Sequence, residues 1–101
     1  MSAGFKTFRE FYPFYLSEHR HPSCRRLHFV GTLLVITCVA LAVGTANLWW
    51  LAAVPPCGYG FAWAGHLFFE RNRPATFTHP LYSLIGDWEM YRDILIGRVP
   101  F

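Results

Sequence analysis

The chain has 101 residues, of which 53% are hydrophobic, 19% aromatic and only 15% charged. Soluble domains carry about 25% charged residues, and small ones need polar residues to cover their large relative surface. This composition therefore excludes an ordinary water-soluble monomer, and it also excludes a disordered chain. We expect one domain over residues 1–101, placed in lipid or covered by a large interface.

The first segment, up to His21-Pro22, has the pattern of an amphipathic helix. Its charged residues lie away from a set of aromatic residues at helical spacing, namely Phe5, Phe8, Phe11, Tyr12 and Tyr15. Such a helix suits the membrane interface. The segment lacks the basic stretch followed by an apolar run that marks a signal peptide.

A long apolar block follows, because no Asp, Glu, Lys or Arg occurs in the 43 residues from Leu27 to Phe69. A membrane-spanning helix needs about 20 apolar residues, so the block has room for two, at about 29–46 and 48–69. Gly44-Thr45-Ala46-Asn47 is a turn signal between them. We expect a helical hairpin that crosses the bilayer or dips deeply into it. The alternative is a pair of core helices in a soluble protein, which so short a chain could hardly cover.

A second amphipathic helix is expected after the apolar block. Pro80 suits a first helical turn, and Gly97 suits a helix end. Apolar residues between them recur at helical spacing: Leu81, Leu84, Ile85, Trp88, Tyr91 and Leu95. The predicted fold class is therefore all-α, a membrane helical hairpin flanked by two amphipathic interfacial helices.

The charges lie at the two ends of the chain, with a net charge of +3. Basic residues that flank apolar segments follow the positive-inside rule. We therefore expect both termini in the cytoplasm, with the hairpin in a bacterial inner membrane or in the endoplasmic reticulum of a eukaryote. The basic residues form no separate patch and no nucleic-acid-binding motif is visible, so we exclude nucleic acid as a partner.

Five histidines occur in this short chain. A hairpin would bring His28 and His66 to the same end, and His19 and His79 lie in the segments that lead into and out of that end. Neutral imidazole suits Fe, Zn, Cu and Ni, and a histidine in a membrane segment is costly without a partner. We therefore expect His19, His28, His66 and His79 to hold a metal. The alternative for each is an interfacial residue bonded to a backbone carbonyl, which we favour for His21.

Charged residues near His66 are further candidates. Glu70 follows it by four residues and shares its helix face, so Glu70 is the candidate catalytic carboxylate; it could bind the metal, orient an imidazole or only pair with an arginine. Arg71 and Arg73 are candidate substrate-binding residues, because a guanidinium can clamp a carboxylate. Asp87 could orient a metal ligand or be an exposed charge, and we favour the exposed charge. The cysteines form no CxxC pair and are interpreted as small buried apolar side chains: Cys24, Cys38 and Cys57.

Two blocks of sequence are distinctive. The first is Phe14-Tyr15-Leu16-Ser17-Glu18-His19, followed by Pro22 and Leu27-His28. The second is Gly65-His66-Leu67-Phe68-Phe69-Glu70-Arg71-Asn72-Arg73-Pro74-Ala75. In these blocks the chain resembles the Mpo1-like family, also known as DUF962, and the resemblance extends over nearly the whole chain.

The resemblance implies an activity. The family's characterised yeast member is an Fe(II)-dependent dioxygenase of the endoplasmic reticulum that performs α-oxidation of 2-hydroxy fatty acids. By that resemblance the cofactor is Fe(II), and the substrates are O2 and a 2-hydroxy long-chain fatty acid. The products are CO2 and the acid one carbon shorter. His19, His28 and His66 carry over as iron ligands, whereas His79 matches no histidine of the yeast protein, so that either His21 or His79 would complete the set.

Two other functions stay open. One is a small non-catalytic membrane protein that binds lipid or scaffolds a partner. The other is a Zn(II) hydrolase with Glu70 as its base. The aromatic surface is also compatible with a homo-oligomer, although no motif specifies one.

Overall fold

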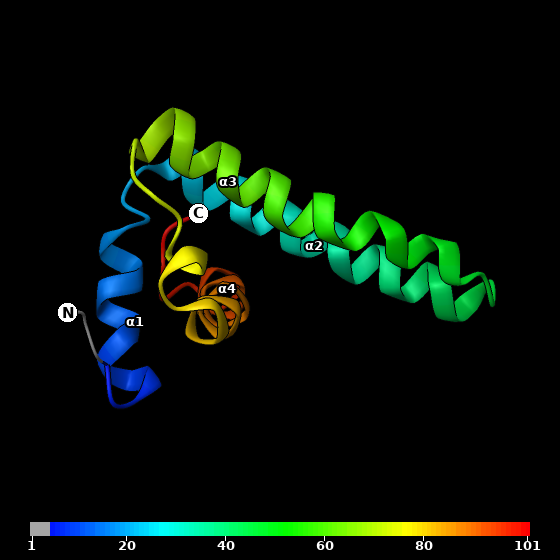
Figure 1. Cartoon of the computed structure of the whole chain (residues 1–101), viewed down its shortest axis with the longest axis horizontal. Coiled ribbons are helices and arrows are strands. Elements are labelled where there is room, and N and C mark those ends of the chain that lie inside the picture. The colour runs from blue at the N-terminus through cyan, green and yellow to red at the C-terminus, as the bar shows by residue number, and fades with distance from the viewer. Residues whose placement is uncertain (1–4) are drawn as a thin grey trace.

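A computed structural model describes residues 5–101, and over that range it contains helices and no strand, which confirms the all-α prediction. Figure 1 shows two long antiparallel legs with two further helices gathered at one end. The first leg is α2, and residues 48–70 form the second, which we call the return leg. The elements in chain order are α1 (Phe8–Ser17), α2 (Pro22–Gly44), η1 (Leu48–Ala53), η2 (Pro56–Gly60), α3 (Phe61–Gly65), η3 (His66–Glu70), η4 (Ala75–Phe77) and α4 (Pro80–Leu95).

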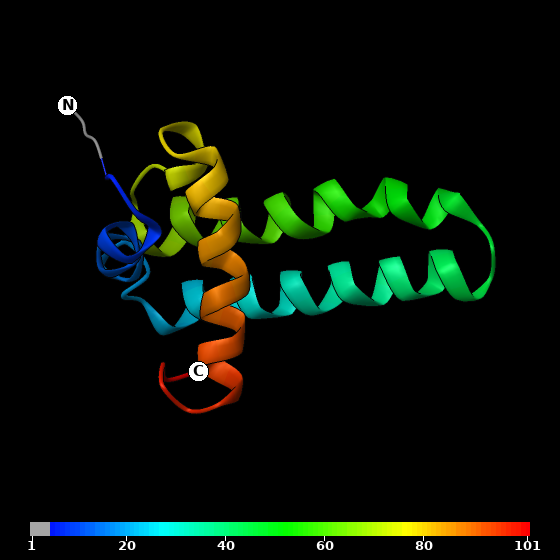
Figure 2. The same cartoon turned by 90° about the horizontal axis from the view of Figure 1, so that it is seen from below.

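The two legs lie side by side in both views (Figures 1 and 2) and meet in a turn at Thr45 and Ala46, as the sequence predicts. Among residues 5–101, α2 is the one helix long and apolar enough to cross a membrane. It begins at Pro22, seven residues before the predicted span of 29–46. His28 and the residues from Pro22 onward therefore belong to the helix itself and not to the segment that leads into it.

The return leg changes its winding along its length. It is a 3-10 helix over Leu48–Ala53 and a π-helix over Pro56–Gly60 and again over His66–Glu70. Pro55 and Pro56 have no amide hydrogen, so the regular α-helical ladder cannot continue through them. The backbone stays in the right-handed helical region at Pro55, and the predicted second span is thus one rod of mixed winding.

A close contact joins α3 to α2 near the end of the legs opposite the turn. A Cβ atom on Gly65 would lie 2.9 Å from the Cys24 Sγ atom and 3.1 Å from the Cys24 Cα atom. Real side chains do not approach so closely, so only glycine at this position allows the two helices to pack at this spacing. The contact fixes His66, the next residue, relative to α2.

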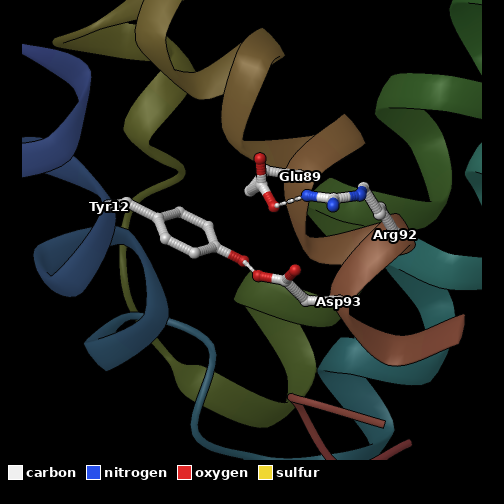
Figure 3. Close-up of polar contacts among 4 residues, drawn as sticks. All are labelled: Tyr12, Glu89, Arg92 and Asp93. Carbon is white, nitrogen blue, oxygen red and sulfur yellow. Dashed lines mark hydrogen bonds and ion pairs between the residues drawn. The ribbon is translucent and has the colours of Figure 1, made fainter. Parts of the chain in front are cut away.

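The helices α1 and α4 pack on each other beside that end of the legs (Figure 2). Their shared core contains Phe11, Tyr15 and Met90. The Tyr12 hydroxyl donates a hydrogen bond of 2.7 Å to the Asp93 carboxylate across the two helices (Figure 3). Phe11 and Tyr15, which we expected to face the membrane interface, are fully buried against α4 instead.

Candidate metal centre

Three imidazole rings from three different elements meet in the interior. His19 directly follows the cap of α1, His28 lies on α2, and His66 begins η3. The His19 Nε2 atom is 3.1 Å from the His28 Nε2 atom and 3.0 Å from the His66 Nε2 atom. All three side chains are buried. We call these three residues the histidine cluster.

The backbone orients the first two rings. The Nδ1 atom of His19 lies 2.6 Å from the Tyr15 carbonyl oxygen, one turn earlier in the chain. The Nδ1 atom of His28 lies 2.8 Å from the Cys24 carbonyl oxygen in the same way. The Tyr15 ring also stacks on the His19 ring with centroids 4.0 Å apart, which holds that imidazole in place.

Asn72 orients the third ring. The π-helix η3 ends at Arg71, whose φ of 56° is left-handed and reverses the chain. This reversal brings the Asn72 Oδ1 atom to 2.6 Å from the His66 Nδ1 atom. The Asn72 Nδ2 group donates to the Glu18 carbonyl oxygen at 3.2 Å, which identifies the other amide atom as the oxygen. Sequence analysis did not single out Asn72.

These contacts determine the tautomer of each ring. A carbonyl oxygen only accepts hydrogen bonds, so the Nδ1 atoms of His19, His28 and His66 carry the hydrogens. In the neutral rings each Nε2 atom then presents a lone pair to the others. Burial, and next the neighbouring imidazoles, lower the pKa of His19 well below its ordinary value, so a bridging proton is disfavoured. A bound cation would satisfy the converging lone pairs.

The spacing and the donor type fit a transition metal. Nitrogen ligands lie about 2.0–2.1 Å from such an ion, so two of them on one ion are roughly 3 Å apart, as the His19 Nε2 atom is from each of the other two Nε2 atoms. The neutral rings with hydrogen-bonded Nδ1 atoms are the form in which metal-binding histidines occur. Iron, zinc, copper and nickel all accept such nitrogen ligands.

Cys24 is a fourth member of the group. One potential ligand atom from each of Cys24, His19, His28 and His66 lies within 4.8 Å of all the others, and all four residues are buried. The Cys24 Sγ atom is 3.7 Å from the His28 Nδ1 atom. The interpretation of Cys24 as a merely apolar side chain missed this proximity, although its spacing of four residues from His28 indicates a shared helix face.

His79 and His21 lie apart from the cluster. His79 caps the start of α4, and its ring packs against the Phe5 and Phe11 rings with centroids 5.2 and 5.3 Å away. His21 caps α2, where its Nδ1 atom accepts a hydrogen bond of 3.1 Å from the Ser23 amide. The partner of the His21 ring is therefore a backbone amide and not the backbone carbonyl that we favoured, and the ring contacts of His79 are with phenylalanines rather than with the cluster.

The charged candidates lie near the cluster but outside it. The Glu70 carboxylate accepts a hydrogen bond of 2.6 Å from the His21 amide, which ties the end of the return leg to the start of α2. Arg71 and Arg73 are exposed. The Arg73 guanidinium lies over the Phe77 ring, 5.5 Å from its centroid. The catalytic role of Glu70 and the substrate-binding role of the two arginines stay predictions.

One arginine joins three segments around the cluster. The Arg25 guanidinium donates to the carbonyl oxygens of His19 at 3.0 Å and Arg20 at 2.6 Å. It also donates to the carbonyl oxygen of Pro100 at 2.9 Å. The loop that carries His19 is thus tied to α2 and to the segment after α4 by a single side chain.

A cavity of about 160 Å³ adjoins the cluster, with His28 and Asp87 in its wall. Asp87 was interpreted as an exposed charge, but it is half-buried and accepts a hydrogen bond from the Tyr15 hydroxyl. Burial raises the pKa of the Asp87 carboxyl to about 6, against the opposing effect of that hydrogen bond. An apolar space therefore reaches the histidines beside a carboxyl group that titrates close to neutral pH.

A family model described as "2-hydroxy-palmitic acid dioxygenase Mpo1-like" matches residues 5–99. The chain belongs to the Mpo1-like family. Comparisons with curated proteins and with solved structures each gave no match. In this Mpo1-like chain the matched range contains all of the histidine cluster, Cys24 and Asn72.

Proposed function

We propose that this Mpo1-like chain is an integral-membrane Fe(II) dioxygenase that acts on 2-hydroxy long-chain fatty acids. The reaction consumes O2 and a 2-hydroxy acid, and it yields the acid one carbon shorter, CO2 and water. The observation that carries the proposal is that the His19 Nε2 atom lies about 3 Å from the Nε2 atoms of both His28 and His66, with all three rings buried. The family description supplies the class of reaction and of substrate.

The chain's own residues would perform three tasks in this reaction. The Nε2 atoms of His19, His28 and His66 would hold the iron, which supplies binding of the hydroxy acid and of O2 together with the redox chemistry. The Tyr15 and Cys24 carbonyl oxygens and the Asn72 amide keep the rings in position. The packed α1 and α4 helices keep bulk water from the cluster, because His19 and His66 are only 1% and 2% exposed.

We propose that Glu70 holds neighbouring segments in place and does not bind the metal. Its carboxylate holds the His21 amide and so fixes the start of α2, which carries Cys24 and His28, against the end of η3. An orienting role fits this contact better than direct ligation.

We further propose that both legs lie in a bilayer with the termini in the cytoplasm. Large apolar side chains on α2 and on the return leg remain exposed in the structure, which suits contact with lipid: Val30, Leu33, Ile36, Val39, Val43, Leu48, Trp49, Leu51, Leu67 and Phe68. Arginines lie at the opposite end from the turn, as the positive-inside rule requires. The membrane would be the bacterial inner membrane or the endoplasmic reticulum.

The test is metal analysis and oxygen uptake on protein purified in detergent under nitrogen. We expect about one iron per chain and oxygen consumption with 2-hydroxypalmitate, both lost in His66→Ala. His79→Ala is the matched control, because it removes a histidine outside the cluster and should keep the iron.

Other results would contradict the proposal. Absence of metal, with His66→Ala behaving like the parent chain, would favour a lipid-binding or scaffolding protein. Zinc in place of iron would favour a hydrolase. Loss of iron in His79→Ala as well would mean that the ligand set differs from the histidine cluster.

A further inference from the structure

The cavity beside the cluster is built by three elements. One face of α2 contributes His28, Thr32 and Val35, whose spacing places them in a row along the helix. Gly58 lies opposite them on the return leg, and Asp87 and Trp88 complete the wall from α4. The cavity therefore runs along the groove between the legs and is closed on one side by α4.

Its polar end adjoins the histidine cluster. Asp87 accepts a hydrogen bond from the Tyr15 hydroxyl, and the Tyr15 ring stacks on the His19 ring. His28 belongs to the cluster and also lines the cavity. Val35 lies seven residues further along α2, which corresponds to roughly 10 Å at the rise of an α-helix. The polar groups are thus gathered at one end, and the far end is apolar.

The cavity is short and opens sideways. Its volume of about 160 Å³ is close to that of the apolar cavity of about 150 Å³ that accommodates benzene, so it can hold on the order of six carbon atoms. Tyr59, Leu84 and Trp88 line it and are 41%, 48% and 44% exposed, so they form a mouth on the flank of the molecule. That flank is apolar, which suits a mouth that opens toward lipid.

We propose that this cavity binds the first carbons of the substrate's alkyl chain, and that the rest of a longer chain leaves between Tyr59 and Trp88 into the bilayer. The identity of the ligand rests on the proposed function. The carboxyl and hydroxyl oxygens then lie at the end shared by His28 and Asp87. Arg71 and Arg73 do not line this cavity, so it offers no arginine clamp at its polar end.

The cavity makes the effect of filling it depend on chain length. Relative to the acid free in water, each methylene that enters the cavity should raise affinity about fourfold, and the cavity is full at an acid of about eight carbons in total. Further methylenes lie in lipid and leave water just as completely, but they do not depend on the cavity. A side chain that fills the cavity should therefore weaken binding of an eight-carbon acid, spare a four-carbon acid, and weaken a twelve-carbon acid no more than the eight-carbon one.

Gly58→Leu is the direct test of the cavity. A Cβ atom at Gly58 would meet the Val35 Cγ2 atom at 3.5 Å, an ordinary contact, so the backbone tolerates a side chain there while a leucine fills the space. Gly60→Leu is the matched control, since Gly60 lies in the same helix with nothing within 4 Å of its Cβ position. Val35→Phe fills the cavity from the opposite wall, and it decides the question if Gly58→Leu does not fold.

Binding is measured by equilibrium dialysis on the purified holoprotein in lipid nanodiscs, under nitrogen so that no turnover occurs. The probes are isotopically labelled 2-hydroxybutanoate, 2-hydroxyoctanoate and 2-hydroxydodecanoate, with free concentrations corrected for partition into lipid. We expect Gly58→Leu and Val35→Phe to weaken octanoate binding at least tenfold, to leave butanoate binding unchanged, and Gly60→Leu to match the parent chain.

Unchanged octanoate binding in folded Gly58→Leu or in Val35→Phe overturns the proposal. So does a loss of butanoate binding in these variants as large as the loss of octanoate binding. These results are independent of iron content and oxygen uptake. Failure of the cavity assignment therefore leaves the dioxygenase proposal intact, and an inactive protein with the expected variant effects would refute only the proposed function.

Discussion

At the scale of single residues, Asn72 determines which nitrogen of His66 can bind a cation. Its amide oxygen accepts the Nδ1 hydrogen, and its amide group is itself held by the Glu18 carbonyl oxygen. Outer contacts of this kind typically change metal affinity 10–100-fold. Asn72 therefore links the end of α1 to the chemistry of the return leg.

Replacing Asn72 tests that role. Asn72→Leu removes the acceptor and should weaken metal binding by about 10–100-fold, whereas Asn72→Asp keeps an acceptor oxygen and should lose much less. Affinity is measured by competition with a chelator of known strength. Equal losses in the two variants would show that the side chain matters for packing and not for orienting the His66 ring.

Asp87 should give the protein a recognisable pH dependence. Its carboxyl pKa is about 6 in the folded state, raised by burial, against about 3.9 in an unfolded chain. Because the folded pKa is the higher one, the stabilising contribution is complete below pH of about 4 and is lost as the pH rises through about 6. Ionised Asp87 therefore destabilises the protein at neutral pH.

Asp87→Asn removes this titration while keeping an acceptor for the Tyr15 hydroxyl. The free energy of unfolding of the variant, relative to the parent chain, should rise by roughly 2 kcal/mol between pH 4 and 7. Chemical unfolding in mixed micelles at several pH values measures it, and the shared titration of the histidines cancels in the difference. A difference that is constant with pH would mean that Asp87 titrates near its ordinary pKa.

The histidines show what sequence could and could not provide. His28 and His66 were placed together because an apolar block with a central turn brings its two ends to the same side. His19 follows one helix and His79 precedes another, so the sequence gives no reason to treat the two histidines differently. Only packing distinguishes them, because the His79 ring lies against Phe5 and Phe11. The contact of Asn72 with His66 depends on the left-handed backbone at Arg71, which no local pattern indicates.

At the scale of helices, the position of α3 against α2 depends on Gly65. Any side chain there would push against both the sulfur and the backbone of Cys24. Because His66 follows directly and His28 lies one turn beyond Cys24, a small displacement of α3 would separate the two imidazoles. The site is thus sensitive to the spacing of the legs as well as to its own residues.

Gly65→Ala tests this dependence. Overpacking should cost about 1–3 kcal/mol of stability and should lower metal affinity at least tenfold, which chelator competition and chemical unfolding can measure. Gly60→Ala is the control, because its Cβ would have nothing within 4 Å. If Gly65→Ala bound metal like the parent chain, the leg spacing would not be what positions His66.

Helix boundaries were partly readable from sequence. The turn after α2 and the Pro80 start of α4 were predicted, because turn residues and proline act locally. The predicted apolar span of 29–46 marks only part of α2, which begins at Pro22 and includes Arg25 and Arg26 in its first turns. Their long side chains let the helix continue where its surroundings become polar.

At the scale of the whole molecule, the structure separates an apolar rod from a polar end. The α2 helix has 23 residues, which at 1.5 Å each give about 34 Å, enough for a hydrocarbon core of about 30 Å. His28 lies in the first two turns of α2, His66 lies near the end of the return leg, and His19 directly follows the cap of α1, so the cluster is at the end of the legs opposite the turn. The proposed site would therefore lie at the membrane surface, with its cavity directed into the lipid.

The crossing can be tested by cysteine labelling. In a Cys57→Ala background, Thr45→Cys places a thiol at the turn, and Arg98→Cys places one at the opposite end. If the legs cross the bilayer, an impermeant maleimide added to intact cells should label Thr45→Cys alone, and inverted vesicles should reverse the result. Labelling of Thr45→Cys only after detergent is added would show that the legs dip into the bilayer without crossing it.

The contacts of Arg25 have a consequence for the order in which the molecule is made. Its guanidinium donates to the carbonyl oxygens of His19, Arg20 and Pro100. The first two bonds join residues that are made early, so the loop bearing His19 can be held against α2 before the rest of the chain exists. The bond to Pro100 can form only after both legs and α4 have been made. Arg25 would therefore fasten the segment after α4 onto an end of the molecule that is already partly assembled, in keeping with folding from the N-terminus during synthesis.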